Sequence, residues 1–386
     1  MTILEHLHYP HRRTAPLTIT SVYTAELAAL SLVHHKTEVQ REKSPIDGLE
    51  WYVQIGKTKV YFADPSVIKT IRPSTHKLLD LGLHKLTQEL GEPITEMDNP
   101  DEIDYTTVTV YTDELCYLNY GEVSRNKKNN LVQHHIYPNL TQFLNVYFRS
   151  RTDKTKMIKI LNSVTYKAGE IKFQFTPEFV EHVKKKSCIQ YPAALFLLNT
   201  NWDINAWYMA KTMFWHWNIL HNAETKTFNR MKVKSLLKYM PCIQEYEVVM
   251  KSQCRSWRCR IAAPFYDAWR KLKEAEVLDL EPPTIEEFIT ERDITADISP
   301  QVLKKNKTSG TVTEWKIYLE FCICFTIADA FDPKQRFNDY KKKQMEKYRK
   351  AAKRSQARQD KKLEEEKKKH AKLAAGYAAL KYNNLY

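Results

Sequence analysis

The segment DINAWYMAKTMFWHWNILHNAETKTFNRMKVKSLLKYMPCIQEYEVVMKSQCRSWRCRIAAPFYDAWRKLK, residues 203–273, decides the fold that we expect. Large apolar side chains recur at helical spacings in its first part, residues 204–220. A turn at 222–229 and a short helix at 231–239, ended by Pro241, follow. A longer basic helix is predicted at 255–276, where Pro264 indicates a kink or a later start. With a β-ribbon after it, this order is typical of a winged-helix DNA-binding domain.

The ribbon is expected in the residues that follow. Residues 277–280 predict a first strand, and 313–327 alternate apolar and polar side chains as a second strand does. A polar insertion, 281–310, separates the two. Beyond Pro333 the chain is highly charged, and we expect either a long helix or a disordered basic tail.

The first half of the chain repeats this order of elements. A hairpin at 51–63 turns at Gly56-Lys57 and precedes it. The predicted elements are a helix at 73–91, a strand at 106–111, a helix at 112–120, a long helix at 126–149 with a kink or boundary at Pro138, and a hairpin of 157–164 with 170–175. A short helix at 179–186 and an apolar connector at 193–198 lead into the second half.

These patterns predict a mainly α fold with small β wings, of class α+β. We divide the chain into an arm and hairpin at 1–63, a first winged helix at 64–192, a second at 193–330 and a basic extension at 331–386. No sequence repeat accompanies the two units, so their duplication rests on the order of elements.

Charge points to a polyanionic partner. The 386 residues carry a formal net charge of +14 with a pI of about 9.2. Roughly 17 Lys and Arg against roughly 6 acids lie between Lys334 and Lys372, so most of the excess belongs to the tail. A binding face elsewhere must therefore come from local clustering.

Other classes of protein fit the composition less well. No apolar run approaches the ~20 residues of a membrane span, and residues 1–13 lack a secretory apolar core. Seven scattered cysteines suit a reducing cytoplasm, and 8 glycines are few for a nucleotide-binding α/β enzyme. We expect a cytoplasmic protein.

Candidate DNA contacts are the basic residues of the two long helices and of the wings. Guanidinium and ammonium groups on an exposed helix bind guanine edges or phosphates. In the second unit Ile261, Phe265, Trp269 and Leu272 face inward, and the candidates are Arg255, Arg258, Arg270, Lys271 and Lys273, with Lys304, Lys305 and Lys307 at the wing. In the first unit the candidates are Arg125, Lys127, Lys128, His134, His135, Arg149 and Arg151, with Lys167 at the wing. The alternative is a solvated basic surface without a partner.

Catalytic, cofactor and metal sites are not predicted. Gly56-Lys57-Thr58 matches the end of a P-loop, but Trp51 occupies the first glycine position. Cys254 with Cys259, and Cys322 with Cys324, lack the spacing of a zinc finger. Four tryptophans could stack on bases, but their helical spacing favours a core: Trp202, Trp207, Trp215 and Trp217.

Several short runs resemble one family in the same order along the chain. They are RPSTHKLLD at 72–80, GEIKFQF at 169–175, VKSLL at 233–237, YEVVM at 246–250 and RIAAPF at 260–265. Together they resemble replication initiator proteins of bacterial plasmids and integrative mobile elements, especially those of Firmicutes. The resemblance covers about residues 71–273. The more aromatic start of the helix at 202–207 departs from the family pattern, and the tail lies outside the resemblance.

The resemblance implies two winged helices that bind repeated sites in double-stranded DNA at an origin. Such initiators help to melt the origin and recruit host helicase or initiator proteins without cutting DNA. They often alternate between a homodimer and a monomer. Two alternatives stay open: a winged-helix transcriptional regulator, and a metal-dependent nicking enzyme built on the paired histidines of His6-Leu7-His8 and a tyrosine.

Overall fold

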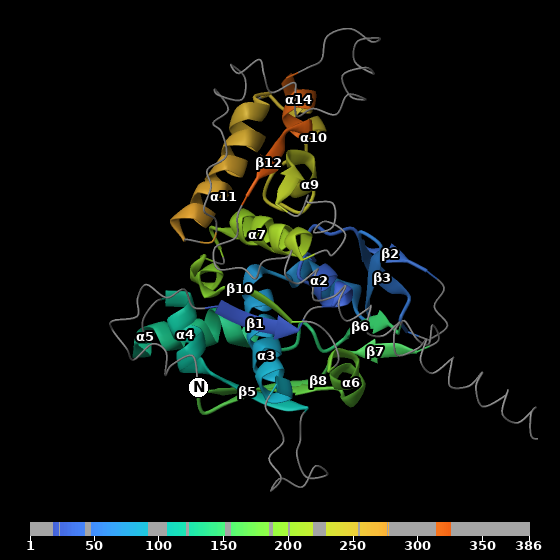
Figure 1. Ribbon diagram of the computed structural model, residues 1–386, viewed down its shortest axis with the longest axis vertical. Helices are drawn as coiled ribbons and strands as arrows, with labels where there is room; N and C mark the ends of the chain where they lie inside the picture. The colour runs from blue at the N-terminus through green and yellow to red at the C-terminus, as the bar shows by residue number, and fades with distance from the viewer. Residues whose placement is uncertain are drawn as a thin grey trace, which may run out of the picture. The chain divides into compact units, whose positions relative to one another are not determined.

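The computed structural model describes residues 18–22, 24–42, 48–91, 106–120, 123–150, 156–184, 188–199, 201–218, 229–253, 255–275, 277 and 314–325. All of these belong to the first of two compact units, Met1–Phe331; the second unit is Asp332–Tyr386. The fold is α+β, with several small antiparallel sheets among its helices (Figure 1). The expected α+β class is therefore confirmed, although the sheets are more extensive than two wings require.

The strands of the described residues form four sheets. Their bounds are β1 Thr18–Val22, β2 Gln40–Arg41, β3 Trp51–Ile55, β4 Thr58–Phe62, β5 Thr107–Tyr111, β6 Val146–Arg149, β7 Met157–Lys159, β8 Leu161–Lys167, β9 Glu170–Phe175, β10 Cys188–Pro192, β11 Arg230–Lys232 and β12 Cys322–Cys324. The strand orders are β1-β10, β11-β12, β2-β3-β4-β6-β7 and β5-β9-β8, with every pair antiparallel.

The helices connect these strands. They are α2 Ala25–Leu30, α3 Pro73–Gly91, α4 Thr112–Tyr120, α5 Arg125–Leu131, α6 Pro177–Val183, α7 Ile204–Trp217, α9 Val233–Leu237, α10 Tyr246–Lys251, α11 Ala263–Glu274 and α14 Glu314–Glu320. Shorter turns are the 3₁₀ helices η2 Pro65–Thr70, η4 Tyr137–Asn139 and η5 Ala193–Leu197, and the π-helical turns η3 Val132–Ile136 and η6 Arg258–Ala262.

In the first half, α3 packs on the sheet β5-β9-β8. Most of its leucines, among them Leu79 and Leu83, are buried, and Gly82 comes so close to the Phe173 ring that an added Cβ would lie 3.0 Å from Cγ. The hairpin β8–β9 turns through Ala168 and Gly169, whose φ angles are +53° and +86°. Two positive φ angles are what a two-residue type I′ turn requires. The helices at 73–91 and 112–120 and the hairpin at 51–63 are therefore confirmed. The hairpin predicted from 157–164 with 170–175 is confirmed from Leu161 onward, whereas residues 157–159 form β7, which pairs with β6 in another sheet.

The predicted long helix at 126–149 is wrong beyond its first three turns. After α5 the chain passes through η3 and η4 and then becomes strand β6, which extends the β3–β4 hairpin. Pro138 explains the change, because its ring would clash with the carbonyl of residue 134 in an α-helix. The π-helical turn avoids this clash, with the N–H of Tyr137 donating to the carbonyl of Val132.

In the second half, the predicted helices at 204–220 and 255–276 are present in shortened form. The second of them starts as η6 and continues as α11, with Pro264 in the first turn of α11. The N–H of Ala263 donates to the carbonyl of Arg258, the same π-type bond that precedes Pro138. Both halves therefore use a π-helical turn two residues before a proline.

Two other predictions for the second half need correction. Residues 231–239 do not form one helix, because β11 pairs with β12 before α9 begins. Residues 314–320 form α14 instead of a strand, and alternation survives only in β12. The predicted strand at 277–280, apart from Val277, and the insertion at 281–310 lie outside the described residues, as does the tail.

An aromatic cluster explains why α14 is a helix. Trp315 and Tyr318 lie three residues apart, which places both side chains on one face of a helix. Trp315 stacks on Tyr246 at 4.4 Å between ring centroids, and the fully buried Tyr318 contacts Trp257 at 5.2 Å. In a strand the same two side chains would point to opposite faces, and only one could join the cluster.

The prediction that four tryptophans lie in the core is confirmed for only some of them. Trp207 and Trp217 are buried on α7, and Trp215 is partly buried. Trp202 is 81% exposed, so its prediction is wrong. Trp202 lies before α7, in a turn where the N–H groups of Asn201 and Trp202 donate to the side-chain oxygen of Asn199. Because the chain is not helical at this position, the helical spacing does not apply to Trp202.

Buried polar contacts join α3 to α7 and to the end of η5. Asp80 and Lys211 form an ion pair whose side chains are 13% and 7% exposed. The ammonium group of Lys77 donates to the carbonyls of Phe196 and Leu198, the latter at 2.7 Å. Burial lowers the pKa of Lys77 to about 7. This region of α3 is therefore a polar junction as well as part of the core.

No helix among the described residues is both long and apolar enough to cross a membrane.

Candidate nucleic-acid interface

The segment from α5 to η4 carries most of the basic residues predicted for the first half. Ser124 caps α5 by accepting a hydrogen bond from the N–H of Lys127 at 3.3 Å, and Leu131 and Ile136 anchor the segment in the core with no exposed surface. The opposite side faces solvent. Its exposed residues are Arg125, Asn126, Asn129, Asn130, Gln133, His134, Tyr137 and Pro138. We call this set the α5 face.

The cations of this segment differ in their surroundings. Arg125 and His134 are exposed on the α5 face. The ammonium group of Lys127 lies 5.6 Å from the centre of the Tyr120 ring. Lys128 pairs with Asp113 at 2.7 Å, with 38% and 45% of the side chains exposed. Such a surface pair contributes at most about 1 kcal/mol, so a phosphate could replace the carboxylate.

His135, next to His134, belongs to the protein interior instead. It is partly buried, and burial together with the charge of Lys77 lowers its pKa to about 4. The imidazole is therefore neutral near pH 7. Of the two adjacent histidines, only His134 is available at the surface.

The turn of the β8–β9 hairpin lies beside this segment. Tyr137, 57% exposed, meets the ring of Tyr166 edge-on, with 5.5 Å between centroids. The N–H of Thr112 donates to the carbonyl of Gly169 at 2.8 Å, which ties the turn to the start of α4. Lys167 is exposed just before the turn. The contact between Tyr137 and Tyr166 therefore joins the α5 face to strand β8 of the hairpin.

Arg149 lies elsewhere, which corrects its predicted place on a long helix. It belongs to β6, where its guanidinium pairs with Glu42 at 3.4 Å and lies 5.5 Å from the centre of the Tyr61 ring. Burial acts to raise the pKa of Glu42, but hydrogen bonds from Lys59 and Tyr61 outweigh it and hold that pKa below its ordinary value. Arg151 is outside the described residues.

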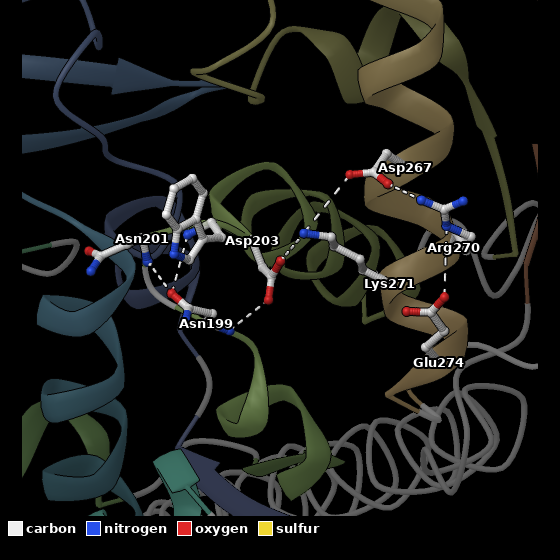
Figure 2. Close-up of polar contacts among 8 residues, drawn as sticks. Asn199, Asn201, Asp203, Asp267, Arg270, Lys271 and Glu274 are labelled. Carbon is white, nitrogen blue, oxygen red and sulfur yellow. Dashed lines mark hydrogen bonds and ion pairs between the residues drawn. The ribbon is translucent and has the colours of Figure 1, made fainter. Parts of the chain in front are cut away.

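In the second half, most of the described candidate residues are exposed, whereas Lys271 is paired with carboxylates inside the fold. Arg255 and Arg258 are exposed at and just before η6. Arg270, with 68% of its side chain exposed, pairs with Asp267 and, at 3.7 Å, with Glu274 along α11 (Figure 2). Lys273 is also exposed, whereas the wing candidates are outside the described residues: Lys304, Lys305 and Lys307.

Lys271 takes part in an internal junction. Its ammonium group pairs with Asp203 at the start of α7 and approaches Asp267 at 3.9 Å (Figure 2). Asp203 also accepts a hydrogen bond from the N–H of Asn199 at 2.7 Å. Lys271 therefore links α11 to the loop before α7, so its charge is already matched by carboxylates.

The amide side chains of the α5 face are functional candidates that the charge pattern alone misses. Asn126, Asn129 and Gln133 are exposed between the cations. The signal is present in the run RNKKNNLVQHH, residues 125–135, where amides outnumber lysines and arginines. Tyr137 is missed for the same reason, because it carries no charge.

Comparison with known proteins adds no assignment. No protein-family model matches the chain, and no curated protein matches it significantly. Within the described part of the chain, no group of three or more His, Cys, Asp or Glu side chains is arranged to hold a metal ion.

Proposed function

We propose that the chain is a sequence-specific double-stranded DNA-binding protein with two tandem winged helices, which initiates replication of a plasmid or other mobile element. The observation that carries the proposal is the α5 face beside the β8–β9 turn. It offers cations and amides on a convex helix surface, next to an exposed hairpin, which suits a major groove and its flanking phosphates.

The connectivity of the first half supports a winged helix. Helix α3, strand β5, helices α4 and α5 and the hairpin β8–β9 follow one another, and β5 pairs with β9. Strands β6 and β7 are an insertion into this order. The second half has a similar succession of α7, β11, α9 and η6 with α11, and β11 pairs with β12. This parallel favours two related units.

Initiation, with recruitment of host helicase or initiator proteins and a homodimeric form, rests on the sequence resemblance. The test is binding of the full chain to DNA flanking its own gene, at two salt concentrations with competitor DNA. A footprint on direct repeats is the expected result. Binding that vanishes at higher salt without a protected site would refute specific recognition.

Further assays separate the alternatives. Plasmid maintenance that depends on the protein is expected of an initiator and not of a transcriptional regulator. A nicking enzyme would relax a supercoiled plasmid in the presence of a divalent metal. A protein that binds DNA without cutting it should leave the plasmid intact. His6 and His8, on which a nicking site would depend, are outside the described residues.

A further inference from the structure

We infer that the amide side chains of the α5 face make the first half of the chain a reader of adenine in A·T base pairs. This inference rests on the proposed function and states which bases the bound DNA sequence would contain. It concerns Asn126, Asn129 and Gln133, all exposed on the side of the helix opposite the buried Leu131.

The three amides are free to bind a ligand. Within the described part of the chain, no hydrogen bond is made by their side chains, whereas the neighbouring Asn130 accepts one from the hydroxyl of Tyr120 at 2.9 Å. Asn130 is thus held by the protein, and its oxygen is partly occupied. The available amides are the three others.

Their spacing fits a groove. A rise of about 1.5 Å per residue places Asn126 and Gln133 roughly 10 Å apart along the segment, a length of about three base pairs. Arg125 is exposed about 100° from Asn126 around the helix, whereas Lys127 lies one turn before the buried Leu131 and is only partly exposed. Amides therefore occupy the outermost line, and Arg125 lies beside it, where a phosphate of a major groove would lie.

The chemistry of the amide selects the base. A carboxamide has one acceptor and one donor side by side, which pair with the N6 amino group and the N7 atom of adenine. Guanine presents two acceptors at the same edge and is better matched by a guanidinium group. A face with amides at its centre should therefore prefer adenine to guanine at the bases it contacts.

The test is selection of binding sites from random DNA by the full chain, followed by the same selection with Asn126→Ala, Asn129→Ala and Gln133→Ala. The expected site contains adenines, and at least one variant should lose a preference for one adenine of about 10- to 100-fold. Replacing that adenine with 7-deazaadenine should weaken binding of the original protein and leave the variant unaffected.

Asn145→Ala is the matched control, because Asn145 is an exposed amide outside the α5 face. It should leave the selected site unchanged. The inference is overturned if all three variants keep the original base preferences, or if they weaken binding to every sequence equally. A protein that selects no site at all would instead refute the proposed function itself.

Discussion

Replacing Lys211 with methionine should destabilise the protein by about 3–5 kcal/mol, because the Asp80 carboxylate would then be buried without its cation. Both side chains of this pair are largely buried between α3 and α7. Burial raises the pKa of Asp80, and the charge of Lys211 opposes that increase. Without Lys211, burial would raise the pKa of Asp80 with no opposing charge from that lysine.

The loss is large enough to measure by urea unfolding. With an m value of about 3 kcal/mol per molar, it corresponds to a midpoint shift of about 1–2 M. Asp80→Leu combined with Lys211→Met should recover most of the stability, because replacing both members of a buried pair with apolar residues is often neutral or stabilising.

A surface pair provides the control. Arg41 and Glu50 are paired with 64% and 39% of their side chains exposed, so Glu50→Gln should cost less than about 1 kcal/mol. The reasoning is refuted if Lys211→Met shifts the midpoint no more than Glu50→Gln. It is also refuted if the double variant loses as much as the two single variants together.

Other outcomes follow from the same contacts. Burial lowers the pKa of His76 to about 3, so the unfolded chain binds a proton that the folded protein does not. Stability should therefore fall as pH drops below about 6.5, by up to about 1.4 kcal/mol per pH unit for this group, as urea midpoints across pH would show. For Lys77 the folded pKa of about 7 lies below its ordinary value, so its contribution to stability should rise with pH above about 7, and Lys77→Met should remove that slope. Arg125→Ala should weaken DNA binding more than Arg270→Ala, because Arg270 already pairs with Asp267 and Glu274; equal losses in a binding assay would contradict this. Removing residues 334–386 should weaken binding to all DNA sequences alike and flatten its salt dependence.

Local patterns predict those elements that local interactions fix. The hairpins at Gly56 and Gly169 and the helix that begins at Pro73 carry their own turn and start signals, and each is present. The inward residues Phe265 and Trp269 of α11 are buried, as their spacing predicts. The exposure of Arg125 at the start of α5 follows from the same reasoning, because the buried Leu131 lies toward the other side of that helix.

The order of most helices and strands, the basic character of the chain and the inner face of its main helices can all be read from the residues alone. Tertiary contacts decided the rest. Short apolar runs suit a helix or a strand equally, so the pairing of β6 with β4 and the aromatic cluster around Trp315 settled those segments. Charge partners also depend on the fold, because Lys271 meets Asp203 across 68 residues and Lys211 meets Asp80 across 131. A sequence shows the sign of each charge, but only folding brings its partner within reach.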